Sequence, residues 1–370
     1  MEFIKGMDIS TLIEEEDCGA EYFDGGKPAD ALEILKKYGA DYVRLRIWND
    51  PYSESGEPYG AGTNDLERTV ELALRAKALN MKILLDLHYS DFWTDPGKQF
   101  IPKAWVGYDL QQLKDAVYDY TLTVLQTMKD NGVLPDMVQV GNELSNGMLW
   151  PVGQLPAYDN LAGLVSAGIR AVRKVSPEIV VMIHLDNGGN NALYRDWFDH
   201  YIERGEDFDV IGMSYYPFWH GTLDDLSRNM EDVAARYHKP IIIAEVSMGF
   251  TVESYASYEC TDEALKGMAT RPEVAARAEY PMTVEGQAAF MKDLMTRIAS
   301  VPEHMGRGFF YWEPAWIPVP GCGWATEASL KYMNDPGPCG NEWANQALFD
   351  YDGNALPALE VIRDFKADKI

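Results

Sequence analysis

Short apolar runs alternate with longer amphipathic segments along almost the whole chain. The short runs are rich in β-branched residues and predict strands over residues 3–8, 41–48, 81–88, 137–143, 179–186, 209–216, 240–245 and 308–312. The longer segments space their apolar residues as helices do and predict helices over residues 29–38, 65–79, 110–129, 159–175, 192–203, 223–237, 283–299 and 355–365. A strand followed by a helix is therefore the repeating unit, and it occurs eight times.

Eight consecutive units of this kind predict an α/β fold in which parallel strands close into a single (β/α)8 TIM barrel. No linker, low-complexity run or shift of composition divides the chain, so we expect residues 1–370 to form one domain, with extended loops after strands 7 and 8. A doubly wound open sheet is the alternative. However, no predicted strand is followed by the G-x-G-x-x-G motif of dinucleotide-binding sheets.

A barrel imposes a second pattern, because alternate residues of each strand point into its lumen. In the second strand this alternation places Arg44, Arg46 and Trp48 inside. In the other strands it assigns a mostly polar set to the lumen: Asp86, His88, Gln139, Gly141, Glu143, His184, Asp186, Gly212, Ser214, Tyr216, Ile243, Glu245, Phe310 and Trp312. The polar members gather toward the carboxyl ends of the strands, where barrels of this class hold their active sites.

Glu143 and Glu245 end the fourth and seventh predicted strands, which stand on opposite sides of an eight-stranded ring. Two facing carboxyl groups are what glycoside hydrolysis requires, since one protonates the leaving oxygen and the other stabilises the developing oxocarbenium ion. Each Glu alone is also compatible with a salt-bridged residue at the barrel rim. The pair at two strand ends predicts a catalytic site.

Neighbouring residues suggest how the two carboxyl groups divide the chemistry. Asn142 can hydrogen-bond the sugar hydroxyl next to the reacting carbon, which favours Glu143 as the acid/base and Glu245 as the nucleophile. The nucleophile must stay ionised, and Arg44 and the phenol of Tyr216 are the expected donors for it.

Other charged residues in the lumen can be explained by structural roles instead of catalytic ones. Either arginine of the second strand could pair with Asp86 inside the barrel, and we expect this of Arg46 rather than Arg44. His88 and His184 could indicate a metal, but no third ligand stands at a usual spacing, so we expect no metal site and assign His88 to a hydroxyl or carboxylate partner.

Aromatic residues suggest how a substrate is held. Trp93, Trp219 and Trp316 lie in loops just beyond strand ends, where an indole can act as a platform for a sugar ring or close the top of the barrel. The residues expected to contact substrate are Arg44, Trp48, His88, Trp93, Asn142, Asp186, Tyr216, Trp219, Trp312 and Trp316.

Composition narrows the classes of partner. The formal net charge is −26, so phosphate backbones are repelled and nucleic acid is not an expected partner, although acidity also serves solubility. No run of 18 apolar residues predicts a membrane span, and Met1-Glu2 does not begin a signal peptide. We expect a monomer that acts outside the cytoplasm, in the medium, at the cell surface or in the periplasm.

The chain has four cysteines, Cys18, Cys260, Cys322 and Cys339, without the paired C-x-x-C spacing of zinc sites. Cys322 and Cys339 fall in one Gly/Pro-rich loop. We expect a disulfide between them, which would stabilise the fold by about 3 kcal/mol and would favour an oxidising compartment.

Several long motifs resemble those of the arabinogalactan endo-β-1,4-galactanases of glycoside hydrolase family 53. They are GADYVRLRIWNDPY, LLDLHYSDFWTDPGKQ, PKAW, PDMVQVGNELSNGMLWP, MIHLDNGG, DFDVIGMSYYPFWHGTL and WEPAW. The resemblance implies a retaining barrel enzyme that cuts the β-1,4-galactan side chains of pectin internally. It also implies an acid/base at Glu143 and a nucleophile at Glu245.

The resemblance further suggests calcium between the loops after strands 7 and 8, as in similar bacterial members of the family. Residues 251–280 offer Asp262 and scattered glutamates rather than the expected run of Asp, His and Asn, so we expect no cofactor. Two alternatives stay open: another barrel glycanase, such as a mannanase or cellulase, or a barrel that binds glycans without cutting them.

Overall fold

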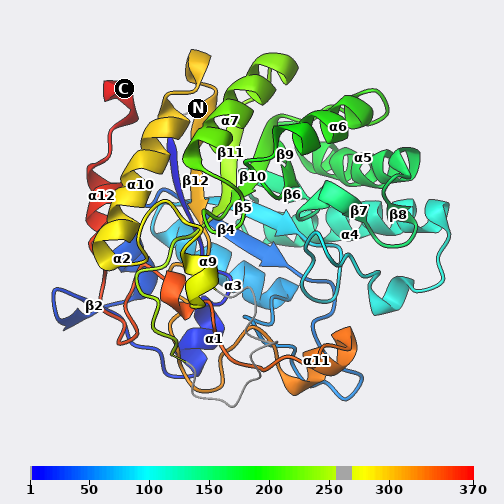
Figure 1. Cartoon of the computed structure of the whole chain (residues 1–370). Coiled ribbons are helices and arrows are strands. Elements are labelled where there is room, and N and C mark those ends of the chain that lie inside the picture. Colours follow the sequence, from blue (N-terminus) through cyan, green and yellow to red (C-terminus); the bar gives the residue numbers. More distant parts are fainter. Residues whose placement is uncertain (1, 256–268) are drawn as a thin grey trace.

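Eight parallel strands close into a barrel in the computed structural model, which describes residues 2–255 and 269–370 (Figure 1). Each strand pairs with its neighbours in the barrel order β1-β12-β11-β10-β9-β6-β5-β4. The strands are β1 (Ile4–Asp8), β4 (Tyr42–Ile47), β5 (Lys82–Leu87), β6 (Met137–Val140), β9 (Val180–Leu185), β10 (Val210–Tyr215), β11 (Ile241–Val246) and β12 (Gly306–Tyr311). The predicted (β/α)8 fold is confirmed, with each strand within a few residues of its expected place.

Helices follow the barrel strands and cover the outside of the barrel (Figure 1). They are α2 (Ala31–Lys37), α3 (Leu66–Ala78), α4 (Leu110–Asp130), α5 (Tyr158–Val175), α6 (Asn191–Ile202), α7 (Leu223–Tyr237), α10 (Val284–Ala299) and α12 (Ala358–Asp364). Most begin at a side chain that accepts a hydrogen bond from a free backbone amide of the first turn, as Asp65 and Asp109 do. The predicted helix starts lie within two residues of the observed ones, except for α12, which has no side-chain cap and begins three residues later than expected.

The loops contain shorter helices, hairpins and turns that the sequence pattern did not predict. They are α1 (Leu12–Asp17), α9 (Pro272–Ala275), α11 (Glu327–Met333), the hairpins β2 (Phe23–Asp24) with β3 (Lys27–Pro28) and β7 (Gly147–Met148) with β8 (Gly153–Gln154), and the 3-10 turns η1 (Lys103–Trp105), η2 (Leu144–Asn146), η3 (Pro302–His304), η4 (Ala344–Gln346) and η5 (Ala367–Lys369). The two longest connections follow β11 and β12, as expected.

The barrel lumen is apolar at one end and polar at the other. An apolar plug fills the amino-terminal part, made of Ile4, Tyr42, Leu84, Met137, Met182, Val210, Ile242, Ala244 and Phe310. The Phe310 ring lies where a side chain at Gly6 would be, since a Cβ there would stand 2.2 Å from it. Polar side chains occupy the layers above the plug, and among the described residues the buried charged groups of the lumen lie toward its carboxyl end.

A β-bulge interrupts the regular alternation of side chains in β11, so one prediction for this strand is wrong. Ile243 was expected in the lumen, but it packs in the helix layer, and Ile242 and Ala244 face inward instead. The register with β10 shifts between Ile243 and Glu245, and such an extra residue turns the side chains that follow it to the other face. Glu245 therefore still points into the barrel, although simple alternation from Ala244 would turn it outward.

The expected disulfide between Cys322 and Cys339 is absent, because both residues are free thiols. The Cys322 side chain is buried against Glu15 of α1. Its thiol is therefore turned toward this helix, and the last loop is held by packing and hydrogen bonds. Cys260 lies outside the described residues.

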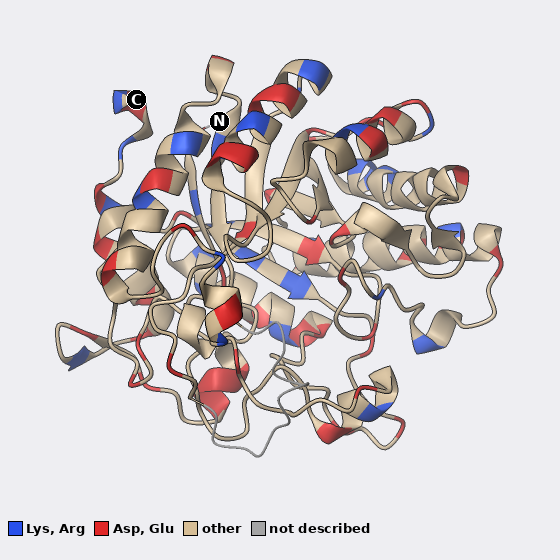
Figure 2. Cartoon of the chain, in the orientation of Figure 1, with Lys and Arg blue, Asp and Glu red and all other residues tan. Residues whose placement is uncertain are grey.

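Acidic residues are spread over helices and loops around the whole barrel (Figure 2). Among the described residues, no helix combines the length and apolarity needed to cross a bilayer.

Candidate active site

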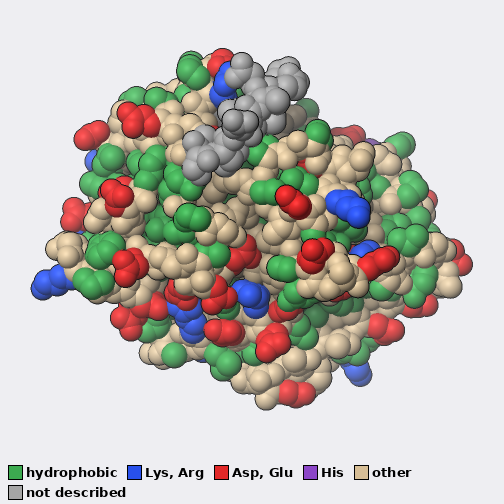
Figure 3. Space-filling model, turned by 90° about the horizontal axis from the view of Figure 1, so that it is seen from below, with side chains coloured by type: hydrophobic (Ala, Val, Ile, Leu, Met, Phe, Trp, Pro, Cys, Tyr) green, Lys and Arg blue, Asp and Glu red, His purple; other side chains and the backbone are tan. Residues whose placement is uncertain are grey.

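A pocket of about 350 Å³ opens at the carboxyl ends of the strands. The loops of this face are seen in Figure 3, where acidic side chains are scattered among apolar ones. Residues from most of the strand ends and from the loops that follow them line the pocket: Arg44, Arg46, His88, Trp93, Thr94, Asp95, Pro96, Lys98, Asn142, Glu143, Asp186, Tyr216, Trp219, His220, Glu245, Trp312, Trp316, Trp324 and Trp343. Both candidate catalytic carboxyl groups are among them.

Glu143 is held by a sharp turn immediately after β6. Gly141 has a φ of 85° and Glu143 a φ of 49°, both in the left-handed region, which is unfavourable for a residue with a side chain. Strained backbone of this kind is concentrated at functional sites, where surrounding contacts hold it. The turn leaves the Glu143 side chain in the pocket and 8% of the residue exposed.

Glu245 is fixed by two donors from different strands. The Arg44 guanidinium donates to Oε1 at 2.8 Å, and the Tyr216 hydroxyl donates to Oε2 at 2.9 Å. Each oxygen of the carboxylate is therefore oriented, and one of the donors is a cation. These are the two donors expected from the sequence.

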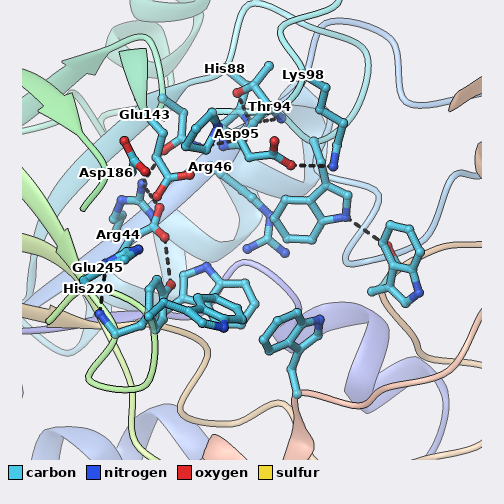
Figure 4. Close-up of a pocket in the computed structure, with 18 of the residues that line it drawn as sticks. Arg44, Arg46, His88, Thr94, Asp95, Lys98, Glu143, Asp186, His220 and Glu245 are labelled. Atoms are coloured by element: carbon cyan, nitrogen blue, oxygen red, sulfur yellow. Dashed lines mark hydrogen bonds and ion pairs between the residues drawn. The ribbon is translucent and has the colours of Figure 1, made fainter. Parts of the chain in front are cut away.

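Glu143 and Glu245 point toward one another (Figure 4). Their nearest oxygens, together with a ring nitrogen of His184, lie within 4.8 Å of one another. Retaining glycosidases separate their carboxyl groups by about 5–5.5 Å and inverting ones by about 6.5–9.5 Å, so this spacing suits direct attack by one carboxylate on the anomeric carbon.

Three such groups could also suggest a metal site, but His184 already makes other contacts. Its Nε2 is 2.8 Å from the Ser214 hydroxyl and its Nδ1 is 3.0 Å from the Gln139 amide nitrogen. A metal ion bound by His184 would have to replace one of these buried hydrogen bonds. Burial and the nearby Arg44 also lower the pKa of His184 well below its ordinary value, so the ring is neutral.

The surroundings of the two carboxyl groups shift their pKa values to different extents. Burial, with Glu245 and Asp186 nearby, raises the pKa of Glu143 well above its ordinary value. Burial also raises the pKa of Glu245, but Arg44 and the Tyr216 hydroxyl oppose that rise. Glu143 therefore keeps its proton to a higher pH than Glu245, as an acid and a nucleophile require.

Ser214 connects Glu143 to His184. The Ser214 hydroxyl donates to Glu143 Oε1 at 2.6 Å, and its oxygen accepts from His184 Nε2 at 2.8 Å. Among the described residues, none hydrogen-bonds to Glu143 Oε2. Because Oε1 is already engaged, Oε2 is the oxygen left to carry a proton toward a substrate.

Arg44 is the centre of a buried ion-pair network. Its guanidinium lies 2.7 Å from Asp8 and 2.8 Å from Asp86, in addition to its contact with Glu245. The prediction that Arg46 pairs with Asp86 is therefore wrong. Arg46 pairs instead with Glu313, although the register of β4 and β5 sets it opposite Asp86, because the Asp86 carboxylate is already paired with Arg44.

His88, Asn142 and Asp186 all reach the pocket. His88 Nε2 contacts Asp86 at 2.9 Å, which is the carboxylate partner expected for it. The Asn142 amide donates to the Thr94 carbonyl at 2.9 Å and has a second N–H left. Asp186 accepts from the Ser145 hydroxyl and lies near Glu143.

Indole rings form much of the pocket wall. Trp93, Trp219, Trp312 and Trp316 line it, and Trp219 is 38% exposed. The expectation for Trp48 needs correction, because its side chain is fully buried. Trp48 packs beneath Phe92 and Trp93, with ring centroids at 4.7 and 5.2 Å, and it supports the wall without reaching the pocket.

Other pocket residues were not foreseen. Trp324 and Trp343 come from the long connection after β12, and Asp95 and Lys98 form an ion pair on a turn after β5. Their signal in the sequence was weak: surplus Trp in the last loop, and the turn sequence DPG. Loops at this end of a barrel surround the active site, but their reach depends on the folded path.

The resemblance suggested calcium between the loops after strands 7 and 8. Asp262, the carboxylate considered for it, lies outside the described residues.

Comparison with known proteins places the chain in a family. The profile of glycosyl hydrolase family 53 matches residues 4–362. An endo-beta-1,4-galactanase of Bacillus subtilis (strain 168) is 39% identical, over 98% of this chain and 86% of its own. An arabinogalactan endo-beta-1,4-galactanase of Cellvibrio japonicus (strain Ueda107) is 36% identical, over 99% and 91%.

A solved structure agrees with these relatives. The Ignisphaera aggregans GH53 catalytic domain superposes with a TM-score of 0.90 and 40% identity, covering 98% of this chain and 96% of its own. The motifs, the barrel and the paired carboxyl groups thus agree with the family match over nearly the whole length. The chain belongs to glycosyl hydrolase family 53.

Proposed function

We propose that this protein is a retaining endo-β-1,4-galactanase in which Glu245 is the nucleophile and Glu143 the acid/base. The observation that carries the proposal is the pair of carboxyl groups within 4.8 Å at the mouth of the barrel. The galactanase names of its relatives support β-1,4-galactan, including the arabinogalactan side chains of pectin, as the substrate.

In the first step, Glu245 attacks the anomeric carbon while Glu143 gives its proton to the glycosidic oxygen, and that bond breaks. In the second step, Glu143 takes a proton from water, which displaces Glu245 and restores the original anomeric configuration. Arg44 and Tyr216 orient the carboxylate of Glu245 for attack and support its charge when it leaves the sugar.

The proposal also covers the organisation of the chain, its cofactors and its partners. The whole chain acts as one catalytic domain, as a monomer and without a cofactor or a nucleic-acid partner. A polymeric substrate cannot enter a cell, which favours a site of action outside the cytoplasm. The open pocket walled by indoles supports binding along a chain, with Arg44, His88, Trp93, Asn142, Asp186, Tyr216, Trp219, Trp312 and Trp316 as contacts.

Product analysis tests this function. Reducing ends should be released from β-1,4-galactan and not from β-mannan or cellulose, and short oligosaccharides should precede galactose if cleavage is internal. Proton NMR of the first product should show the β anomer before mutarotation. Preference for mannan or glucan would establish the other glycanase alternative, and tight binding without cleavage would establish the non-catalytic one.

The first pH prediction concerns Asp186→Asn. Asp186 helps to raise the pKa of Glu143, so neutralising it should lower that pKa. Activity is lost as pH rises through the pKa of the acid, and the alkaline limb of kcat/KM should move to lower pH by about one unit. Asp196→Asn, at an exposed position on α6, is the matched control. An alkaline limb that stays in place would contradict this influence of Asp186.

The second pH prediction concerns Ser214→Ala, which should shift the pKa of Glu143 in the opposite direction. The Ser214 hydroxyl favours ionised Glu143, so Ser214→Ala should raise the pKa of Glu143 and extend the alkaline limb to higher pH. The variant should also lose roughly 1–3 kcal/mol of stability, because His184 Nε2 loses its buried partner. Rate profiles and chemical denaturation measure the two effects, and a downward shift of the limb would exclude the assignment.

A further inference from the structure

Arg46 is a buried cation beside the pocket that has no part in the proposed chemistry. The residue is 1% exposed, and it lines the pocket wall with the face of its guanidinium on an indole. The guanidinium carbon lies 4.2 Å from the Trp93 ring centroid and 5.4 Å from that of Trp48. A planar cation at this distance stacks on an aromatic face.

The guanidinium is held from both ends. Its Nη1 pairs with Glu313, which also accepts from the Thr11 hydroxyl at 2.6 Å. Its Nη2 donates to the carbonyl of Ala61 at 2.7 Å. These contacts fix the plane of the guanidinium against the Trp93 ring.

The carbonyl that receives Arg46 belongs to a strained turn. Ala61 and Thr63 have φ values of 52° and 45°, which are unfavourable for residues with side chains and most of all for a β-branched one. Two hydrogen bonds hold this turn in place. The Gly62 amide donates to Glu14 of α1 at 2.8 Å, and the Ala61 amide donates to the Gly323 carbonyl at 3.0 Å. A strained conformation persists where surrounding contacts determine it.

Trp93 has one further anchor on the pocket side. Its indole Nε1 donates to the carbonyl of Trp324 at 2.9 Å, and its ring centroid lies 6.2 Å from that of Trp312. Trp324 and Trp312 both belong to the connection after β12. Arg46 thus supports the face of the indole, and the hydrogen bond to Trp324 fixes its edge.

We propose that Arg46 is a positioning residue that holds the Trp93 indole as a rigid platform for a sugar ring of the substrate. The inference rests on the proposed function for the identity of the substrate. Its physical basis is that a ring already fixed in its binding conformation loses less freedom when a sugar stacks on it. Lysine cannot replace this support, because it has neither a planar face nor a fork that reaches Glu313 and Ala61 together.

The test is a double-mutant cycle of Arg46→Lys and Trp93→Ala. In the Trp93 background, Arg46→Lys should raise the KM for galactan about threefold to tenfold, with kcat within about twofold, because one side chain loses its ordering. In the Trp93→Ala background the same change should have almost no effect. Arg75→Lys, which alters the ion pair of Arg75 with Glu16 and Asp30 on the outside of the barrel, is the matched control.

An equal rise of KM in both backgrounds would overturn the proposal, since it would show that Arg46 acts other than through Trp93. So would a fall of kcat at unchanged KM. Thermal melts establish that each variant is folded. If Arg46→Lys does not fold, Glu313→Gln serves instead, because it keeps an acceptor for Arg46 and removes the charge that fixes it.

A measurement without substrate separates this inference from the proposed function. Fluorine NMR of protein labelled with 5-fluorotryptophan reports the environment of Trp93, whose resonance is assigned by Trp93→Phe. Arg46→Lys should shift and broaden that resonance, and an unchanged resonance would overturn the inference. A wild-type protein that does not cleave galactan would instead refute the proposed function and leave this result standing.

Discussion

Glu245→Gln should abolish the release of reducing ends from galactan, with kcat falling by on the order of 10⁴-fold or more, as loss of a nucleophile does. The amide cannot form the glycosyl-enzyme bond. Its oxygen can still accept from Arg44, and its NH2 group takes the place of the other carboxylate oxygen, where it can donate to the Tyr216 hydroxyl oxygen. Binding of galacto-oligosaccharides should therefore stay measurable by calorimetry. A reducing-sugar assay with purified variant measures the loss.

Glu178→Gln is the matched control, because this glutamate is exposed at the opposite end of the barrel. It should leave both hydrolysis and binding unchanged. Hydrolysis of galactan by Glu245→Gln at the wild-type rate would refute the assignment of the nucleophile. Loss of binding together with activity would show that the substitution disturbs the pocket as a whole.

Glu143→Ala should have the second largest effect, and the effect should depend on the leaving group. On galactan, the departing sugar oxygen needs a proton, so kcat/KM should fall by about 10²–10⁴-fold. On aryl galactosides with acidic phenols, the first step needs little protonation and should proceed, after which the glycosyl-enzyme accumulates because no base activates water. A burst of phenol followed by slow turnover is the expected trace.

Added azide provides the decisive control for this variant. A small anionic nucleophile needs no general base, so it should restore turnover on the aryl substrate and yield a β-galactosyl azide. Wild-type protein should show no such acceleration. Equal losses on galactan and on the activated substrate, without rescue by azide, would count against Glu143 as the acid/base.

The negative charge of the site bears on the kind of polysaccharide that fits it. Arg44 is shared among three carboxylates, Asp8, Asp86 and Glu245, and Lys98 pairs with Asp95, whereas no ion pair among the described residues neutralises Asp186 in the pocket. A uronic acid entering this pocket would meet uncompensated negative charge. This arrangement fits the neutral galactan chain of the proposal.

The sequence alone was sufficient for the fold and for the two central carboxyl groups. Periods of two and of 3.6 residues, together with helix caps such as Asp65 and Asp109, mark elements whose positions depend on local chemistry. A closed parallel barrel then places every strand end on one rim. Glu143 and Glu245 had to meet there once their strands were recognised.

Predictions from local sequence pattern were wrong where contacts between distant segments determine the orientation of a side chain. The bulge before Glu245 shifts the register of β11, so simple alternation misplaced Ile243. Trp48 has the spacing of a pocket residue, but Phe92 and Trp93 cover it. Cys322 and Cys339 share a loop, yet the Cys322 side chain is buried against Glu15 from the start of the chain.

The sequence by itself determined that this protein is an eight-stranded barrel with two acidic groups at its rim, since strand, helix and cap signals act over a few residues. Only the tertiary structure decided which arginine pairs with Asp86, that Ser214 engages one oxygen of Glu143, and that Arg46 lies against Trp93. Each of these contacts joins residues from different strands or loops. Their separation in space is set by the closure of the barrel, and no local pattern encodes it.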